Sequence, residues 1–121
     1  MIDLKELRIG NYIFSNSSKL PYWEISSEDF SFMNGHEVHY HPVELTEEWL
    51  IKLGFKNTYD QYFEHENMPF FELLDSGRGE GYNNGWRMFN NSGNSIIFAI
   101  KSVHQLQNLY YALTGDELCV K

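Results

Sequence analysis

The segment 102–115 constrains the fold more than any other, because it carries a helix start, an apolar stripe and a helix stop. Ser102 is a preferred N-cap, and Gln105 three residues later predicts a capping box. Gly115 can adopt the left-handed conformation that ends a helix. Apolar side chains repeat at helical spacing along one face, which we expect to be buried: Val103, Leu106, Leu109, Tyr110 and Leu113. The pattern predicts a helix over about 103–114 that anchors the fold and carries no chemistry.

A second and shorter helix is predicted over about 46–53. Thr46 is a good N-cap, and Glu47 and Glu48 lie favourably at the positive end of the helix dipole. Gly54 ends the pattern. Because this helix has only about two turns, we expect tertiary packing to stabilise it.

The rest of the chain is typical of short β-strands. Aromatic residues make up 17% of the sequence, and large flat side chains in short runs favour strands. Asn34 and Gly35 form the strongest hairpin signal. The expected strands lie at about 9–14, 22–25, 29–33, 37–40, 59–64, 69–74, 86–89 and 95–100. The sequence therefore predicts an α+β fold, with an antiparallel, strongly twisted sheet or small barrel and two short helices, in a single domain over residues 1–121.

The net charge of −8, from 17 acidic and nine basic residues, bears on the partner. Such a surface repels nucleic-acid phosphate and anionic membranes, and the basic residues are dispersed. Direct nucleic-acid binding is therefore disfavoured, whereas a basic protein surface is a suitable partner.

The compartment is indicated by the cysteine content and by the lack of targeting signals. Cys119 is the single cysteine, so no internal disulfide can form, and the sequence shows no signal peptide or apolar span. We therefore expect a reducing cytoplasm and no contact with a membrane.

Three histidines form the one cluster with metal-ligand character. On a strand His39 and His41 would face the same side and His36 the other, so convergence requires a bend, and only Glu44 could add a carboxylate. We expect a histidine-rich sheet surface, with no metal and no cofactor. The glycine-rich stretch 77–81 lacks the lysine and hydroxyl pair of a phosphate-binding loop, so we expect a flexible hairpin loop suited to recognition.

No catalytic group of side chains can be assembled from the sequence. Glu64 and Glu66 would share a strand face as a solvated edge. A pair of Cys119 with His104 is a weak candidate, because we expect the thiol in a tail after the last helix. A hydrolase or nuclease would need a clustered set of ionisable groups. The sequence therefore indicates a protein that is not an enzyme.

Three blocks of sequence resemble a set of uncharacterised small proteins encoded by bacteriophages, prophages and their bacterial hosts. The blocks are residues 7–12 (LRIGNY), residues 42–55 (with LTEEWL and LGF) and residues 103–115 (VHQLQNLYYALTG), in the same order and across nearly the whole chain. That family has no known catalytic motif, so the resemblance assigns no functional residue. It implies a context in which small acidic proteins bind host proteins and inhibit host defence, anti-CRISPR proteins among them.

Two functions follow as hypotheses. The first is a non-catalytic protein-binding module, cytoplasmic in its bacterial host, that blocks a nucleic-acid-handling defence effector by docking on its basic surface. The candidate contacts are the acids Glu44, Glu47, Glu48, Glu64 and Glu66, and the loop group Arg78, Trp86 and Arg87. The alternative is a small β-barrel that binds RNA or single-stranded DNA by stacking bases on exposed aromatic residues such as Trp23 and Trp86.

Overall fold

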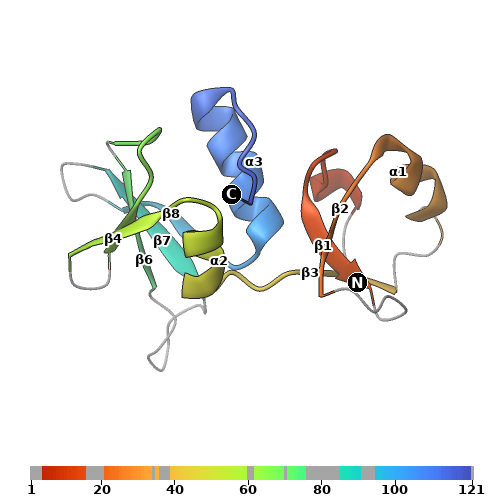
Figure 1. Cartoon of the computed structure of the whole chain (residues 1–121), viewed down its shortest axis with the longest axis horizontal. Helices are drawn as coiled ribbons and strands as arrows, with labels where there is room; N and C mark the ends of the chain where they lie inside the picture. Colours follow the sequence, from red (N-terminus) through yellow and green to blue (C-terminus); the bar gives the residue numbers. More distant parts are fainter. Residues whose placement is uncertain are drawn as a thin grey trace.

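The protein is an α+β fold with antiparallel strands, as the sequence predicts. The described strands form two sheets where one sheet or small barrel was expected, and α-helices form at three places where two were expected. The structure, a computed structural model, describes residues 4–15, 21–33, 35, 39–59, 62–69, 71–75, 85–90 and 95–120. Over these residues the strands form one three-stranded and one five-stranded sheet. The longest helix, α3 (Val103–Thr114), lies between the two sheets (Figure 1).

The N-terminal sheet has the strand order β2-β1-β3, and both of its strand pairs are antiparallel. Its strands are β1 (Tyr12–Ser15), β2 (Trp23–Glu24) and β3 (Tyr40–Pro42). The 3-10 turn η1 (Leu4–Glu6) precedes the sheet, and helix α1 (Ser27–Met33) lies between β2 and β3 in the sequence. The predicted pairing of the first two strands is confirmed, with Ile13 opposite Trp23.

Helix α1 corrects the prediction of a strand at 29–33. Alternation of Phe30 and Phe32 suggested a strand, but the three-residue spacing of Phe30 and Met33 also suits one face of a helix, and both belong to the N-terminal core. Asp29 accepts hydrogen bonds from the backbone N–H (2.7 Å) and the hydroxyl (3.0 Å) of Ser26. This local pair at the start of α1 is the signal that the strand interpretation overlooked.

The hairpin expected at Asn34 and Gly35 is therefore not a connection between two strands. Gly35 follows α1 with a φ of 88°, a left-handed conformation that glycine adopts without a Cβ penalty. Asn34 and residues 36–38 lie outside the described part of the chain. Of the strand expected at 37–40, His39 is not in a strand and Tyr40 begins β3 (Tyr40–Pro42).

Strand β1 is buried on both faces because it lies between two hydrophobic cores. Ile13 points into the N-terminal core, while Tyr12 belongs to the main core and Phe14 packs against it. Successive side chains of a strand point to opposite faces, so one strand can serve two cores. The N-terminal core also holds Leu7, Ile25, Met33 and Tyr40.

The second sheet is a meander in which each strand pairs with the next along the chain. It comprises β4 (Lys56–Tyr59), β5 (Tyr62–Glu64), β6 (Phe71–Asp75), β7 (Trp86–Asn90) and β8 (Ser95–Ile100). The single strand predicted at 59–64 is wrong, since Tyr59 ends β4 and its register partner Tyr62 begins β5. The hairpin of 86–89 with 95–100 is confirmed.

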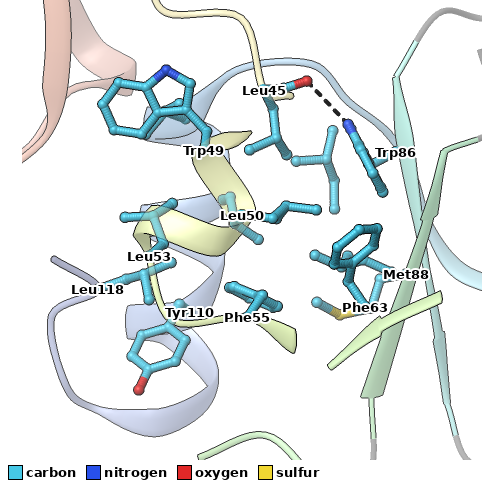
Figure 2. Packing of buried hydrophobic residues seen from close by; sticks show 14 of the residues in the cluster. Leu45, Trp49, Leu50, Leu53, Phe55, Phe63, Trp86, Met88, Tyr110 and Leu118 are labelled. Carbon is cyan, nitrogen blue, oxygen red and sulfur yellow. Dashed lines mark hydrogen bonds between the residues drawn. The ribbon is translucent and has the colours of Figure 1, made fainter. Parts of the chain in front are cut away.

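Both predicted helices form with their predicted N-caps. Thr46 Oγ1 accepts the N–H of Trp49 at the start of α2 (Glu47–Lys52), and the reciprocal capping box of Ser102 and Gln105 begins α3. Gly115 ends α3 with a φ of 80°. Figure 2 shows how α2, α3 and the second sheet meet in the main core, where Leu50, Phe63, Met88 and others pack together. Leu113, predicted in the buried stripe, is instead 44% exposed.

Candidate partner-binding surface and a pocket beside α3

Three of the predicted contact acids lie together in sequence and are all exposed. Glu47 and Glu48 occupy the first turn of α2, where the helix dipole favours a negative charge. Glu44 makes an isolated antiparallel bridge with Ser102, which fixes the segment before α2 against the start of α3. We call Glu44, Glu47 and Glu48 the α2 acidic group; its backbone is anchored although its side chains face solvent.

The other two predicted acids are placed differently. Glu64 ends β5, is half-buried, and lies opposite Lys56 in the register of the β4–β5 pair. Cross-strand partners of opposite charge attract each other and partly neutralise each other's charge. Glu66 is exposed in the turn that follows β5. The structure thus gives Glu64 a cationic neighbour, which reduces its value as a contact for a basic partner.

Trp86 requires a correction, because the expected surface contact is a core residue. Its side chain is 3% exposed, and its ring meets that of Phe63 edge to face at a centroid distance of 5.6 Å. The indole N–H donates to the backbone oxygen of Leu45 at 3.0 Å, the dashed line in Figure 2. Arg87, next along β7, is half-buried, and Arg78 lies outside the described residues. Trp86 therefore joins the second sheet to the segment before α2 and offers no surface to a partner.

The histidine cluster is described only in part. His36 lies outside the described residues, His39 is exposed, and His41 is half-buried with its ring 5.2 Å from that of Phe14, its register partner. In the part of the chain that the structure describes, no group of three histidine, cysteine or acidic side chains could hold a metal ion.

A pocket that the sequence analysis missed lies beside the first turns of α3. Its volume is about 460 Å³, and it is lined by Lys5, Glu6, Arg8, His104, Gln105 and Asn108. The first three come from η1 and the turn after it, and the last three from α3. Residues from opposite ends of the chain thus form one polar site.

Arg8 is the most firmly held of the charged groups in this pocket. Its Nη1 donates to Asn108 Oδ1 at 2.8 Å, its Nη2 binds Glu117, and its guanidinium lies 4.1 Å from the ring centroid of Tyr111. Asn108 also donates from Nδ2 to the backbone oxygen of Glu6 at 2.6 Å. The guanidinium therefore has a fixed position against α3.

Gln107 connects the N-terminal sheet to α3. Its side chain is fully buried and makes three hydrogen bonds to the backbone. Oε1 accepts the N–H of Tyr12 at 2.8 Å, and Nε2 donates to the oxygens of Gly10 and Leu118, each at 3.0 Å. This arrangement satisfies one backbone N–H and two backbone oxygens that would otherwise lie buried without a partner.

His104 is buried in the wall of the pocket, only 2% exposed. Its Nε2 lies 3.5 Å from Glu6 Oε2, and neither ring nitrogen has a hydrogen-bond partner. Burial lowers the pKa of His104 from its usual 6.5, because removal from water disfavours the imidazolium; the nearby Glu6 carboxylate opposes this effect in part. The imidazole is therefore neutral near pH 7.

The last helix also carries polar residues that its apolar stripe does not explain. His104, Gln107 and Asn108 are polar residues that interrupt or flank the apolar stripe, and two of them are buried. Polar residues at such positions signal that the helix packs against a polar partner. These polar residues are visible in the sequence, but the sequence does not show which segment of the chain packs against them.

Comparison with known proteins gives no match to a family model, to a curated protein or to a solved structure. Within the described ranges, no helix is long and apolar enough to cross a membrane. Function is therefore inferred from the arrangement of the side chains themselves.

Proposed function

We propose that this protein is a non-catalytic binding module that docks through an acidic surface onto a host protein whose own basic surface handles nucleic acid. In the phage context that the sequence resemblance implies, the partner is a defence effector in the bacterial cytoplasm, a class that includes CRISPR nucleases. Binding there would compete with nucleic acid for the same basic surface.

The observation that carries this proposal is the negative charge of the exposed surface. Nine acidic residues are exposed in the described part of the chain, against four exposed lysines, so the described surface is acidic. The acids are Glu6, Glu24, Glu28, Glu44, Glu47, Glu48, Glu66, Asp116 and Glu117, and the lysines are Lys5, Lys52, Lys56 and Lys101. Complementary charge steers encounter and orients partners.

The α2 acidic group is the strongest candidate for the centre of this contact. Glu44, Glu47 and Glu48 are exposed on a backbone tied to α3 by hydrogen bonds from Leu45 N–H to the Lys101 oxygen and from Val103 N–H to the Val43 oxygen. A preorganised backbone reduces the entropy lost on binding.

The placement of the aromatic residues favours this proposal over binding to single-stranded nucleic acid. Trp86 is buried, and Trp23 is half-buried against the N-terminal core with its ring 5.7 Å from that of Tyr40. The large apolar side chains that are exposed in the described segments are Ile9, Ile51, Tyr111 and Leu113. Only Tyr111 among them could stack a base, and the Arg8 guanidinium already lies on its ring.

The test compares two triple variants of equal charge change. In the first, Glu44, Glu47 and Glu48 become glutamine; in the second, the control, Glu24 and Glu28 become glutamine and Asp116 becomes asparagine. Each variant is first checked by thermal unfolding. We then measure inhibition of CRISPR nuclease activity and salt-dependent binding to the purified effector, and we expect the first variant alone to lose both by at least about tenfold.

Equal activity of the two triple variants would contradict the role of the α2 acidic group. Binding that persists unchanged as ionic strength rises would contradict electrostatic docking altogether, because contacts between exposed charges are screened by salt. Salt-sensitive binding to single-stranded oligonucleotides, without binding to the effector protein, would support the base-stacking alternative instead.

A further inference from the structure

We propose that the pocket beside α3 binds a small oxyanion, a carboxylate or a phosphate group, which takes the place of the Glu6 carboxylate next to His104. This inference is independent of the proposed docking function, because its residues are not those of the α2 acidic group. It assigns a ligand to a pocket whose wall contains a buried polar side chain without a hydrogen-bond partner.

Two cationic side chains line the pocket together with residues of α3. These are Lys5 and Arg8, and Arg8 is fixed by Asn108 and by the ring of Tyr111. His104 and Gln105, in the first turn of α3 after Ser102, also line the pocket, and this turn carries the positive end of the dipole of a 12-residue helix. These sources of positive potential favour an anion at the same place.

His104 supplies the second observation. Its side chain is 3% exposed in the pocket wall, and its Nδ1 and Nε2 lack hydrogen-bond partners. An unsatisfied buried polar group is costly, so a ligand that accepts a hydrogen bond from the imidazole gains free energy. In the present arrangement the acceptor that faces the imidazole is the Glu6 carboxylate, whose Oε2 lies 3.5 Å from Nε2.

The position of Glu6 indicates the kind of ligand. Its Oε2 is 3.5 Å from His104 Nε2, so a carboxylate oxygen already lies near the imidazole, slightly too far for a hydrogen bond. The Glu6 side chain is 55% exposed and is thus free to turn outward. A free oxyanion can move closer than the tethered Glu6 carboxylate, and Glu6 is then a competitor for the site.

Binding of an oxyanion is coupled to a proton on His104. The charged groups that face the imidazole are Glu6 and Lys5 from η1 and Arg8 from the following turn, with Glu117 paired to Arg8; Gln105 and Asn108 on α3 are uncharged. An anion in place of Glu6 stabilises the imidazolium by charge and by a charge-assisted hydrogen bond. Affinity should therefore rise as the pH falls through the titration of His104.

The test follows the His104 ring by NMR during titration with inorganic phosphate and, in a separate arm, with acetate. The His104 signal is assigned by its absence in His104→Gln. We expect saturable shifts at His104, with affinity roughly tenfold higher in Glu6→Gln, because that variant keeps the shape of the side chain and removes the competing charge. Lys5→Gln should bind more weakly, whereas the control Lys52→Gln, on α2 beside Trp49, should bind as the unmodified protein does.

The two arms identify the source of the oxyanion, since saturation by acetate alone indicates a carboxylate and saturation by phosphate alone indicates a phosphate group. Absence of a saturable shift at His104 in both the unmodified protein and Glu6→Gln would overturn the proposal. So would saturable binding of zinc that Glu6→Gln abolishes, because Glu6 would then be a metal ligand and not a competitor. Equal phosphate affinity in Glu6→Gln and the unmodified protein would place the anion elsewhere.

Discussion

The indole of Trp86 shows how one hydrogen bond can determine the role of a residue. Because its N–H is bonded to the Leu45 oxygen inside the core, Trp86→Phe leaves that oxygen unsatisfied and removes part of the packing against Phe63. We expect a loss of about 2 kcal/mol in the free energy of unfolding, measured by urea denaturation. Trp23→Phe, which changes a half-buried ring of the smaller core, should cost less. Equal losses for the two variants would contradict the buried role of Trp86.

His104 predicts a pH dependence of stability with a definite sign. Burial lowers its pKa in the folded protein below the usual value of 6.5, so the unfolded chain binds a proton more readily. The contribution of neutral His104 to the free energy of unfolding is fully present above pH 6.5. It is lost as the pH falls toward the lower pKa that His104 has in the folded state. We expect urea midpoints to fall over this range, and His104→Gln to fall less. A steeper fall in His104→Gln would show that His104 is not the group responsible.

At the scale of elements, the sequence predicted those structures whose signals are local. The caps of α2 and α3 each depend on residues three positions apart, so Thr46, Ser102 and Gln105 were read correctly. Helix α1 is the exception, because its local Ser26–Asp29 signal was outweighed by Phe30 and Phe32, whose spacing fits a strand. Its burial depends on residues distant in sequence, in the core that holds Ile13 and Tyr40. Tertiary packing determines whether a short segment becomes a helix or a strand, and the spacing of apolar residues over five positions gives no information about that packing.

The capping box of α3 gives a prediction at this scale. Ser102 Oγ accepts the N–H of Gln105 at 3.4 Å, and Gln105 Oε1 accepts the N–H of Ser102 at 3.1 Å. We expect Ser102→Ala to lower the free energy of unfolding by about 1 kcal/mol, whereas Ser102→Gly should cost only a few tenths. Chemical denaturation of the two variants measures the difference. A smaller effect of alanine than of glycine would show that the hydroxyl does not cap the helix in solution.

At the scale of the whole molecule, the pocket could not have been predicted because its parts are about as far apart in sequence as this chain allows. Arg8 and Asn108 are 100 residues apart, and Gln107 reaches Tyr12 across 95. The residue types alone suggested no site, since lone polar residues in a helix and a lone arginine in a turn are common. The acids of the α2 acidic group, by contrast, could be proposed together because they are close in the sequence.

The same long-range contacts predict that the two ends of the molecule can be loosened separately. The N-terminal sheet has its own core and is joined to α3 through Gln107, whereas the second sheet is joined to the segment before α2 through Trp86. Gln107→Leu leaves the Tyr12 N–H and the oxygens of Gly10 and Leu118 unpaired, at a cost of roughly 3 kcal/mol. We expect this loss to lower the free energy of local opening of β1, β2 and β3 before it affects the second sheet.

Native-state hydrogen exchange measures this separation directly. In Gln107→Leu we expect faster exchange in β1, β2 and β3 with protection retained in β6 and β7, and in Trp86→Phe the opposite distribution. The two variants act as controls for each other, because each removes one buried side-chain link to the backbone at a different end of the molecule. If both variants accelerated exchange equally in all strands, the chain would unfold as one cooperative unit, and the two cores would not be separable.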